Sequence, residues 1–353
     1  MATTVCKLDV TVDANNPRPA ALEIMKHVRP YWKGENVQLK VFTGGNTNKI
    51  FGCYLDENER QMVLLRVFGK KSEIMIDRKR EIRNFQILHR AKCGAELYCI
   101  FNNGLCYQFI PGSILDADLV RNDKVYPLIA HKMARIHAIK PEDGETVPEP
   151  STFQSLRRYL QNFPRQFEDP EKNASFKKEI VSHEQLGKEI DELEAALKPL
   201  NSPMVFCHND LLLANIIYDE QTNMISFIDY EYGAFNYQAF DIANHFNEYA
   251  GVWTALDYNR YPEKEYQLKW LHKYLSDWYT MRGINKYVTK KDTEILYVQV
   301  NKFALVSHLS LSMWAIIQAA HSDIDFDFLQ YGILRFSEYF KRKEEFLPLE
   351  MPI

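Results

Sequence analysis

The chain has 353 residues, of which 46% are hydrophobic, 13% aromatic and 25% charged, a composition that excludes a fibrous or disordered protein. This length exceeds that of a single compact core, so we expect two lobes. The net charge of −4 argues against a nucleic-acid-binding surface, and the six cysteines, which include no CxxC pair, argue against a zinc site.

The N-terminal segment contains no apolar run long enough for a signal peptide, and we expect a flexible tail over residues 1–20. The most apolar stretch, 303–320, contains His308, Gln318 and three serines. These interruptions favour a buried helix over a membrane span. We therefore expect a cytoplasmic protein without stable membrane insertion.

Residues 21–112 predict a small lobe built on a sheet. Strands are expected over 37–42, 49–55 and 61–69, followed by a helix over 72–91 and by strands over 96–101 and 105–110. The last two strands flank Asn103-Gly104, a strong hairpin signal. The result is a five-stranded antiparallel sheet with one helix. Pro111-Gly112-Ser113 cannot continue a strand, so we place the lobe boundary there.

Residues 113–353 predict a mainly helical lobe, which makes the fold class α+β. Helices are expected over 125–139, 182–197 and 263–281, from Thr289 onward, and over 326–340. One stretch, 204–233, interrupts this pattern with the order strand, loop, strand, turn, strand. Polar residues concentrate in this stretch, so we look for the chemistry there.

Three residues of the interruption suit phosphoryl transfer. Asp210 follows His208 in the loop, Asn215 begins the next strand, and Asp229 ends its hairpin partner. A loop carboxylate can accept the proton of an attacking hydroxyl, while an amide oxygen and a second carboxylate bind Mg²⁺ on nucleotide phosphates. The alternative is that Asp210 and Asn215 are ordinary turn residues.

The small lobe offers matching nucleotide-binding features. The sequence TGGNTNKI (43–50) forms a Gly-rich turn between two strands, and its backbone amides could cover phosphates. Arg66 lies in the third strand and Glu81 in the helix, as a phosphate-pairing cation and its carboxylate anchor do in kinases. An ordinary hairpin loop and a solvent-facing Arg66 remain open alternatives.

Several longer stretches resemble the choline/ethanolamine kinase family, and its ethanolamine kinases in particular. They are FCHNDLLLANIIYDE, FIDYEYGAFNYQAFDIANHFNEYAGV, FTGGNTNKIFGCYL, FNNGLCYQFIPG and the late SHLSLSMWAIIQAA and IDFDFLQYGILRF. The resemblance spans about residues 20–342. It implies a protein-kinase-like bilobal fold, ATP with Mg²⁺, and phosphorylation of ethanolamine to phosphoethanolamine, the first step of the CDP-ethanolamine route to phosphatidylethanolamine.

The resemblance carries over to the motif positions of this chain. It makes Asp210 the base and Asn215 and Asp229 the metal ligands, in agreement with the reasoning from the residues. It adds a linker, 108–112, that contacts adenine. The expected ATP-binding residues are Gly44, Gly45, Asn46, Thr47, Asn48, Arg66, Glu81, Gln108, Phe109 and Ile110.

For the acceptor, the family binds an ammonium group between acidic and aromatic side chains, which here suggests Glu248, Trp253, Trp314 and Tyr331 beside Asp210. Each of the four could instead be a core residue. Leu311 stands where relatives usually carry a second tryptophan. A quaternary ammonium relies on aromatic faces, whereas a primary one can donate to carboxylates, so the missing ring favours ethanolamine over choline.

Other functions remain open. Asn209 and the sequence after Asp229 differ from those of protein kinases, and no A-P-E segment follows, so a small-molecule acceptor is favoured. Choline kinase is the second candidate and an antibiotic kinase the third. A pseudokinase that binds nucleotide without chemistry and a peripheral membrane scaffold are alternatives from other classes. The oligomeric state, including a homodimer, stays open.

Overall fold

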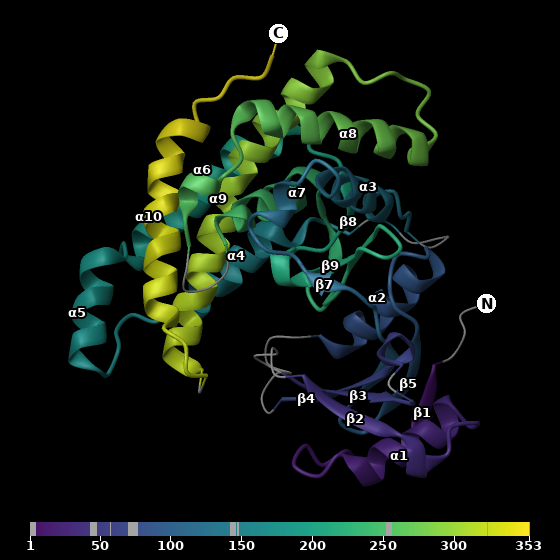
Figure 1. Ribbon diagram of the computed structural model, residues 1–353. Coiled ribbons are helices and arrows are strands. Elements are labelled where there is room, and N and C mark those ends of the chain that lie inside the picture. Colours follow the sequence, from purple (N-terminus) through teal and green to yellow (C-terminus); the bar gives the residue numbers. More distant parts are fainter. Residues whose placement is uncertain are drawn as a thin grey trace. The chain divides into compact units, whose positions relative to one another are not determined.

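The computed structural model describes residues 5–42, 48–56, 58–69, 77–141, 146, 148–251, 256–322 and 324–352. The chain forms two compact units, shown in Figure 1. The first consists of Met1–Ser113 with Ile217–Tyr232, and the second of Ile114–Ile216 with Gly233–Ile353. The chain first passes from one to the other within the short strand β7 (Ser113–Ile114).

The first unit contains a six-stranded sheet with the order β1-β5-β6-β4-β3-β2. Its strands are β1 (Cys6–Leu8), β2 (Gln38–Phe42), β3 (Asn48–Tyr54), β4 (Val63–Phe68), β5 (Leu97–Phe101) and β6 (Gly104–Gln108). Two helices accompany it, α1 (Arg18–Val28) and α2 (Arg78–Arg90). All neighbouring strands are antiparallel except β1, which pairs with β5 in parallel.

Strand β4 contributes apolar side chains to the core from one face and the arginine Arg66 from the other. Successive side chains of a strand point to opposite faces. Val63, Leu65 and Val67 join the apolar core formed with α1, and the alternate position Arg66 forms an ion pair with Glu81 of α2. Figure 1 shows α1 against one face of this sheet. The predicted five antiparallel strands are present as β2 to β6, and Arg66 lies on the face of β4 opposite this core.

The predicted flexible tail over 1–20 is wrong for most of its length. Cys6–Leu8 form strand β1, and Val12 is buried, with its backbone bonded to the side chain of Asn103. A three-residue strand is too short for an alternation signal, and its partner β5 lies some 90 residues away in sequence. Helix α1 also begins within the predicted tail, at Arg18.

The second unit is helical, as predicted. Its helices are α3 (Tyr126–His137), α4 (Ser151–Asn162), α5 (Pro170–Glu179), α6 (His183–Leu197), α7 (Gln238–Asn247), α8 (Lys264–Arg282), α9 (Lys290–His321) and α10 (Phe328–Phe346). The predicted start at Thr289 is confirmed, because this residue and Asp292 form a reciprocal capping box at α9. Helices α9 and α10 run side by side in Figure 1.

Helix α9 is long and apolar enough to cross a membrane by length and composition alone, but 67% of its most apolar 18-residue window is buried within the protein. It contacts α4, α7, α8 and α10. An amphipathic helix buries one stripe, whereas a helix that is apolar all round serves as the core of a larger body. We conclude that α9 is the central helix of the second unit.

The strand order predicted over 204–233 is present, as β8 (Met204–Cys207), β9 (Ile216–Asp219) and β10 (Met224–Phe227). Sequence reasoning missed β11 (Ala234–Tyr237), which pairs with β8 in antiparallel. It also placed the whole stretch in the helical lobe, whereas Ile217–Tyr232 belongs to the first unit. The ion pair between Arg60 and Asp219 accounts for part of this assignment.

Candidate active site

The loop that carries Asp210 connects β8 to a single 3-10 turn, Leu213–Asn215. Its backbone is held by α7. The amides of His208 and Asn209 donate to the Asp241 carboxylate at 2.9 and 2.7 Å, and the amide of Leu211 donates to Asn244 Oδ1 at 2.9 Å. The residues on both sides of Asp210 are thus fixed by one helix.

Asp241 can accept these bonds because it is a buried, ionised carboxylate. His137 Nε2 donates to it at 2.9 Å, and Tyr274 Oη lies 2.6 Å from the other ring nitrogen of His137. Burial alone would raise the pKa of Asp241, but the hydrogen bond and charge of His137, followed by His208, outweigh it and hold the pKa below its usual value. The loop is therefore anchored on a fixed negative charge.

Sequence reasoning missed Asp241, Asn244 and His137. Asp241 and Asn244 lie three residues apart, on one face of a helix whose residues are all buried. Two polar side chains at that spacing in an otherwise buried helix need internal partners. That spacing could have indicated that Asp241 and Asn244 have internal partners, but it does not identify those partners.

The Asn215 side chain is bonded to the backbone of Asp210. Its side chain is 8% exposed, and its Nδ2 donates to the backbone carbonyl of Asp210 at 2.9 Å. This bond uses the donor end of the amide and turns the oxygen end away from it. Oxygen is the ligand atom that Mg²⁺ prefers, so the orientation fits a metal ligand.

Asp229 belongs to the first unit, where it lies 3.5 Å from Arg66 Nη1. Arg66 is 4% exposed and also pairs with Glu81, which excludes the alternative of a solvent-facing arginine. The backbone of Asp229 has φ of +63°, a region that aspartate tolerates better than most residues. The next carbonyl, that of Tyr230, accepts from Asn84 Nδ2 at 3.0 Å.

Carboxylate oxygens of Glu81, Asp229 and Glu231 lie within 4.8 Å of one another. Glu231 was not predicted. Burial, followed by the nearby charge of Asp229, raises its pKa to about 7, and its buried Oε2 has no hydrogen-bond partner among the described residues. A bound divalent cation would stabilise the charged form of Glu231 and give its Oε2 a partner, so this donor set fits Mg²⁺.

The predicted nucleotide-binding residues are only partly described. Gly44, Gly45, Asn46 and Thr47 lie outside the described residues, and Asn48 begins β3.

In the linker, the backbone and side chain of Gln108 both bond to Glu96. The Phe109 ring lies 6.2 Å from that of Phe42, and Ile110 follows. Gly112 has φ of +132°, and a Cβ there would lie 2.6 Å from the carbonyl oxygen of Tyr218. Only glycine fits this turn.

Of the predicted acceptor-binding residues, Trp253 lies outside the described residues. Trp314 and Tyr331 belong to one series of aromatic contacts, in which Trp314 touches Phe328, Phe328 touches Phe326, and Phe326 touches Tyr331, at centroid distances of 5.7, 4.8 and 6.0 Å. Glu248 is buried and forms an ion pair with an arginine of α10. Glu248, Trp314 and Tyr331 thus all lie in the second unit, where the aromatic series connects Trp314 to Tyr331 through two phenylalanines.

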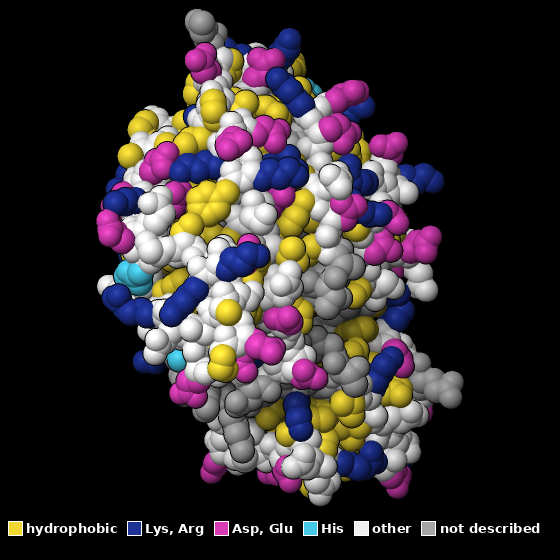
Figure 2. Space-filling view, turned by 90° about the vertical axis from the view of Figure 1, so that its left-hand side faces the viewer, with side chains coloured by type: hydrophobic (Ala, Val, Ile, Leu, Met, Phe, Trp, Pro, Cys, Tyr) yellow, Lys and Arg dark blue, Asp and Glu magenta, His cyan; other side chains and the backbone are white. Residues whose placement is uncertain are grey.

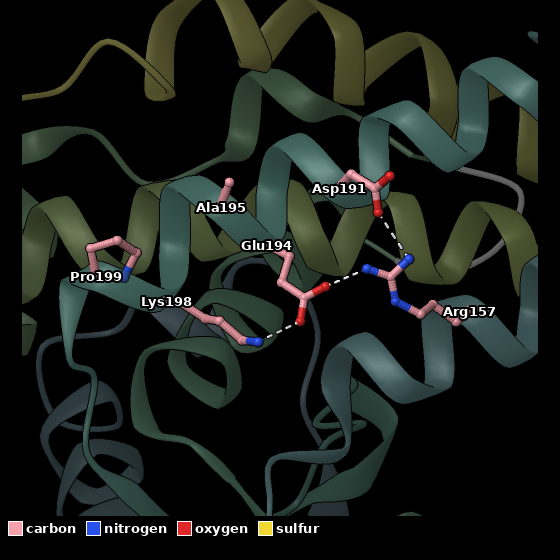
Figure 3. A pocket seen from close by; sticks show the side chains of 6 residues that line it. All are labelled: Arg157, Asp191, Glu194, Ala195, Lys198 and Pro199. Carbon is pink, nitrogen blue, oxygen red and sulfur yellow. Dashed lines mark hydrogen bonds and ion pairs between the residues drawn. The ribbon is translucent and has the colours of Figure 1, made fainter.

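A separate pocket of about 410 Å³ lies between α4 and α6, and Figure 3 shows the side chains that line it. Arg157 pairs with Asp191 and Glu194, and Lys198 pairs with Glu194. These charges already satisfy one another, and the pocket contains none of the predicted residues. We therefore do not assign it to the active site.

The family model of choline/ethanolamine kinase matches residues 39–340. The human protein named ethanolamine kinase 1 is 44% identical over 351 residues, which cover 99% of this chain and 77% of the relative. A solved ethanolamine kinase of Plasmodium vivax has a TM-score of 0.78 at 27% identity and covers 93% of this chain and 89% of its own. A choline kinase of Cryptosporidium parvum has a TM-score of 0.75 at 25% identity, with coverages of 93% and 95%.

Proposed function

The chain belongs to the choline/ethanolamine kinase family, and on this premise we propose that it transfers the γ-phosphoryl group of ATP to ethanolamine. Its fold is the protein-kinase-like bilobal fold of these kinases. The observation that carries the proposal is the anchored loop around Asp210. A kinase needs a carboxylate held at a fixed position beside the attacking hydroxyl, and the bonds that the loop amides donate to Asp241 and Asn244 supply that rigidity.

In the proposed reaction, Asp210 accepts the hydroxyl proton of ethanolamine as the oxygen attacks the γ-phosphorus. The bond between the γ-phosphorus and the bridging oxygen of ADP breaks, and phosphoethanolamine forms. Arg66, anchored by Glu81, balances negative charge on the phosphates. The chain's own contribution is mostly positioning and electrostatics, as expected for phosphoryl transfer.

Mg²⁺ is the proposed metal, with Asn215 and Asp229 as ligands. The orientation of the Asn215 amide, whose Nδ2 is the atom bonded to the Asp210 carbonyl, and the carboxylates around Asp229 support this assignment. When bound, Mg²⁺ neutralises charge on the nucleotide phosphates. Glu231 is a further candidate ligand because its pKa is raised and its Oε2 has no hydrogen-bond partner in the part of the chain that the structure describes, so a nearby cation would stabilise its charged form.

ATP is the co-substrate used by the family. We propose that the Gly-rich turn contributes backbone amides to its phosphates and that the linker receives the adenine. The proposed set is Gly44, Gly45, Asn46, Thr47, Asn48, Arg66, Glu81, Gln108, Phe109 and Ile110. The fixed backbone of Gln108 and the neighbouring rings of Phe42 and Phe109 support the linker assignment.

For the acceptor, we propose that Glu248, Trp253, Trp314 and Tyr331 surround the ammonium group. A carboxylate beside aromatic faces is a suitable environment for an ammonium that also donates hydrogen bonds. Phosphoethanolamine then enters the CDP-ethanolamine route to phosphatidylethanolamine. The expected location is cytoplasmic.

We propose neither nucleic acid nor a stably inserted membrane as a partner. On the face drawn in Figure 2, Lys and Arg lie interspersed with Asp and Glu, which supports the exclusion of nucleic acid as a partner for that face.

The proposed specificity is tested by comparing kcat/KM for ethanolamine and choline in an ADP-release assay. We expect ethanolamine to be preferred by roughly 10-fold or more, because a site that hydrogen-bonds a substrate N–H rejects an analogue that lacks it. Mono- and dimethylethanolamine should fall in between, in order of their remaining N–H donors. Equal values for ethanolamine and choline would instead favour the runner-up, a choline kinase. If the protein binds Mg-ATP but forms no ADP in the presence of any of these acceptors, it is a pseudokinase.

A further inference from the structure

Arg335 of α10 is a fully buried arginine, with 0% of its surface exposed. Its Nη2 donates to Glu248 Oε1 at 2.5 Å, and its Nε donates to Tyr331 Oη at 3.1 Å. The guanidinium carbon also lies 5.3 Å from the centre of the Tyr331 ring. One planar, rigid group therefore fixes both a carboxylate and an aromatic ring.

The arrangement around Arg335 suits a small ammonium group. Tyr331 is the end of the aromatic series that runs through Phe326 and Phe328 to Trp314. Glu248 adds a carboxylate held by the same arginine. Aromatic faces attract any ammonium, and a carboxylate accepts hydrogen bonds only from an ammonium that has N–H groups. The combination distinguishes a primary from a quaternary amine.

A purely structural ion pair is the competing explanation. Buried ion pairs add little stability unless their remaining donors and acceptors are satisfied. Arg335 Nη1 and the hydroxyl of Tyr258, whose ring lies 5.9 Å from the guanidinium carbon, are both buried without a hydrogen-bond partner among the described residues. Such unpaired polar atoms are costly, so the pair is poorly explained by stability alone.

We propose that Arg335 is a positioning residue for the amino alcohol, which holds the Glu248 carboxylate and the Tyr331 ring in the orientation that receives a primary ammonium. The proposal rests on the proposed function and extends it to a residue outside the predicted set. The observation that supports the proposal is that one guanidinium donates hydrogen bonds to both Glu248 and Tyr331.

Removing the Arg335 cation should also change the ionisation of Glu248. Burial raises the pKa of Glu248, and Arg335 opposes that rise, so without Arg335 the carboxyl holds its proton to higher pH. The other titratable and charged groups around the pair are Tyr331 and Glu338 of α10, Arg342 of α10, Tyr258 of the 3-10 turn Tyr258–Arg260, and His308 of α9. Burial, followed by Arg335 and Arg342, lowers the pKa of His308, so it supplies no replacement charge near neutral pH.

The test compares Arg335→Gln and Arg335→Lys with a matched control, Lys343→Gln. Lys343 lies on the same helix and pairs with Glu189 and Glu192, away from the aromatic series. For Arg335→Gln we expect KM for ethanolamine to rise roughly 10- to 100-fold, the value of a hydrogen bond to a charged group. KM for Mg-ATP should stay within about twofold of wild type, since none of the proposed nucleotide-binding residues is changed.

Two further readouts separate positioning from stability. The preference for ethanolamine over choline should fall by about tenfold, because choline has no N–H for Glu248 to accept. In Arg335→Gln, the rise of kcat/KM for ethanolamine with pH should shift to higher pH than in wild type, because Glu248 keeps its proton to higher pH. The control variant should show neither change.

Arg335→Lys keeps the positive charge, but an ammonium group lacks the planar fork that bonds Glu248 and Tyr331 together. KM for ethanolamine should therefore rise about tenfold. Wild-type KM for ethanolamine in both variants would overturn the proposal, as would equal loss with ethanolamine and choline. If Arg335→Gln does not fold, Arg335→Lys decides, and failure of both to fold would assign Arg335 to stability and contradict the proposal. Wild-type enzyme that does not phosphorylate ethanolamine would overturn the proposed function itself.

Discussion

Asp210→Asn is expected to lower kcat for ethanolamine phosphorylation by roughly 10²- to 10⁴-fold, the range that a positioned general base contributes. Asparagine has nearly the same shape but cannot accept the hydroxyl proton. The amides of the loop bond to Asp241 and Asn244, and these bonds are unchanged in the variant. KM for Mg-ATP should therefore change by less than about threefold. A coupled ADP-release assay measures both values.

The matched control for this variant is Asp191→Asn, an aspartate on the surface of α6 whose partner is Arg157. Exposed ion pairs contribute about 1 kcal/mol or less, and this one lies outside the active site, so its kcat should equal that of wild type. The free energy of unfolding of Asp210→Asn should lie within about 1 kcal/mol of wild type, since its side chain is half-buried. Wild-type kcat in Asp210→Asn would exclude Asp210 as the base.

Asp241→Ala is expected to lose both stability and activity. The carboxylate accepts the amides of His208 and Asn209 and the ring N–H of His137. Its removal leaves these buried donors unpaired, which should lower the free energy of unfolding by about 3–5 kcal/mol. The released loop no longer positions Asp210, so kcat should fall by at least about 10²-fold. Urea unfolding and the ADP-release assay measure the two effects.

The pH dependence of stability provides an independent check on Asp241. Its pKa is lower in the folded protein than the usual 3.8, so the unfolded chain binds the proton more tightly. The stabilisation from Asp241 is therefore fully present above pH 3.8 and is lost as the pH falls from there through the folded pKa. The stability difference between wild type and Asp241→Ala should shrink below pH 3.8. A difference that stays constant down to lower pH would contradict an ionised anchor.

The features that sequence predicted best are those with local signals. The strands of the first unit, the Asn103-Gly104 turn and the Thr289 capping box are each specified by neighbouring residues, and each is present. The ion pair between Arg66 and Glu81 is also present. It was predictable because both residues occupy recognisable positions in a strand and the helix that follows it.

The features that sequence did not predict depend on distant partners. Asp241 contacts a loop 33 residues earlier, and Arg335 contacts Glu248 across 87 residues. No local pattern specifies such a pairing. Glu231 was missed for a different reason, because its unusual pKa arises from burial that only the folded chain reveals. The residues that anchor the site are therefore harder to predict than the residues that perform the chemistry.

The central claim is that this chain transfers phosphate from ATP to the hydroxyl of ethanolamine with Asp210 as the base. Phosphorus NMR of the reaction mixture tests it most directly, because it identifies the product as well as its formation. With Mg-ATP and ethanolamine, wild-type protein should produce ADP and one new phosphomonoester signal that coincides with added phosphoethanolamine, and Asp210→Asn should produce neither at a comparable rate. Release of inorganic phosphate instead of a phosphomonoester, or no turnover by wild type, would contradict the account.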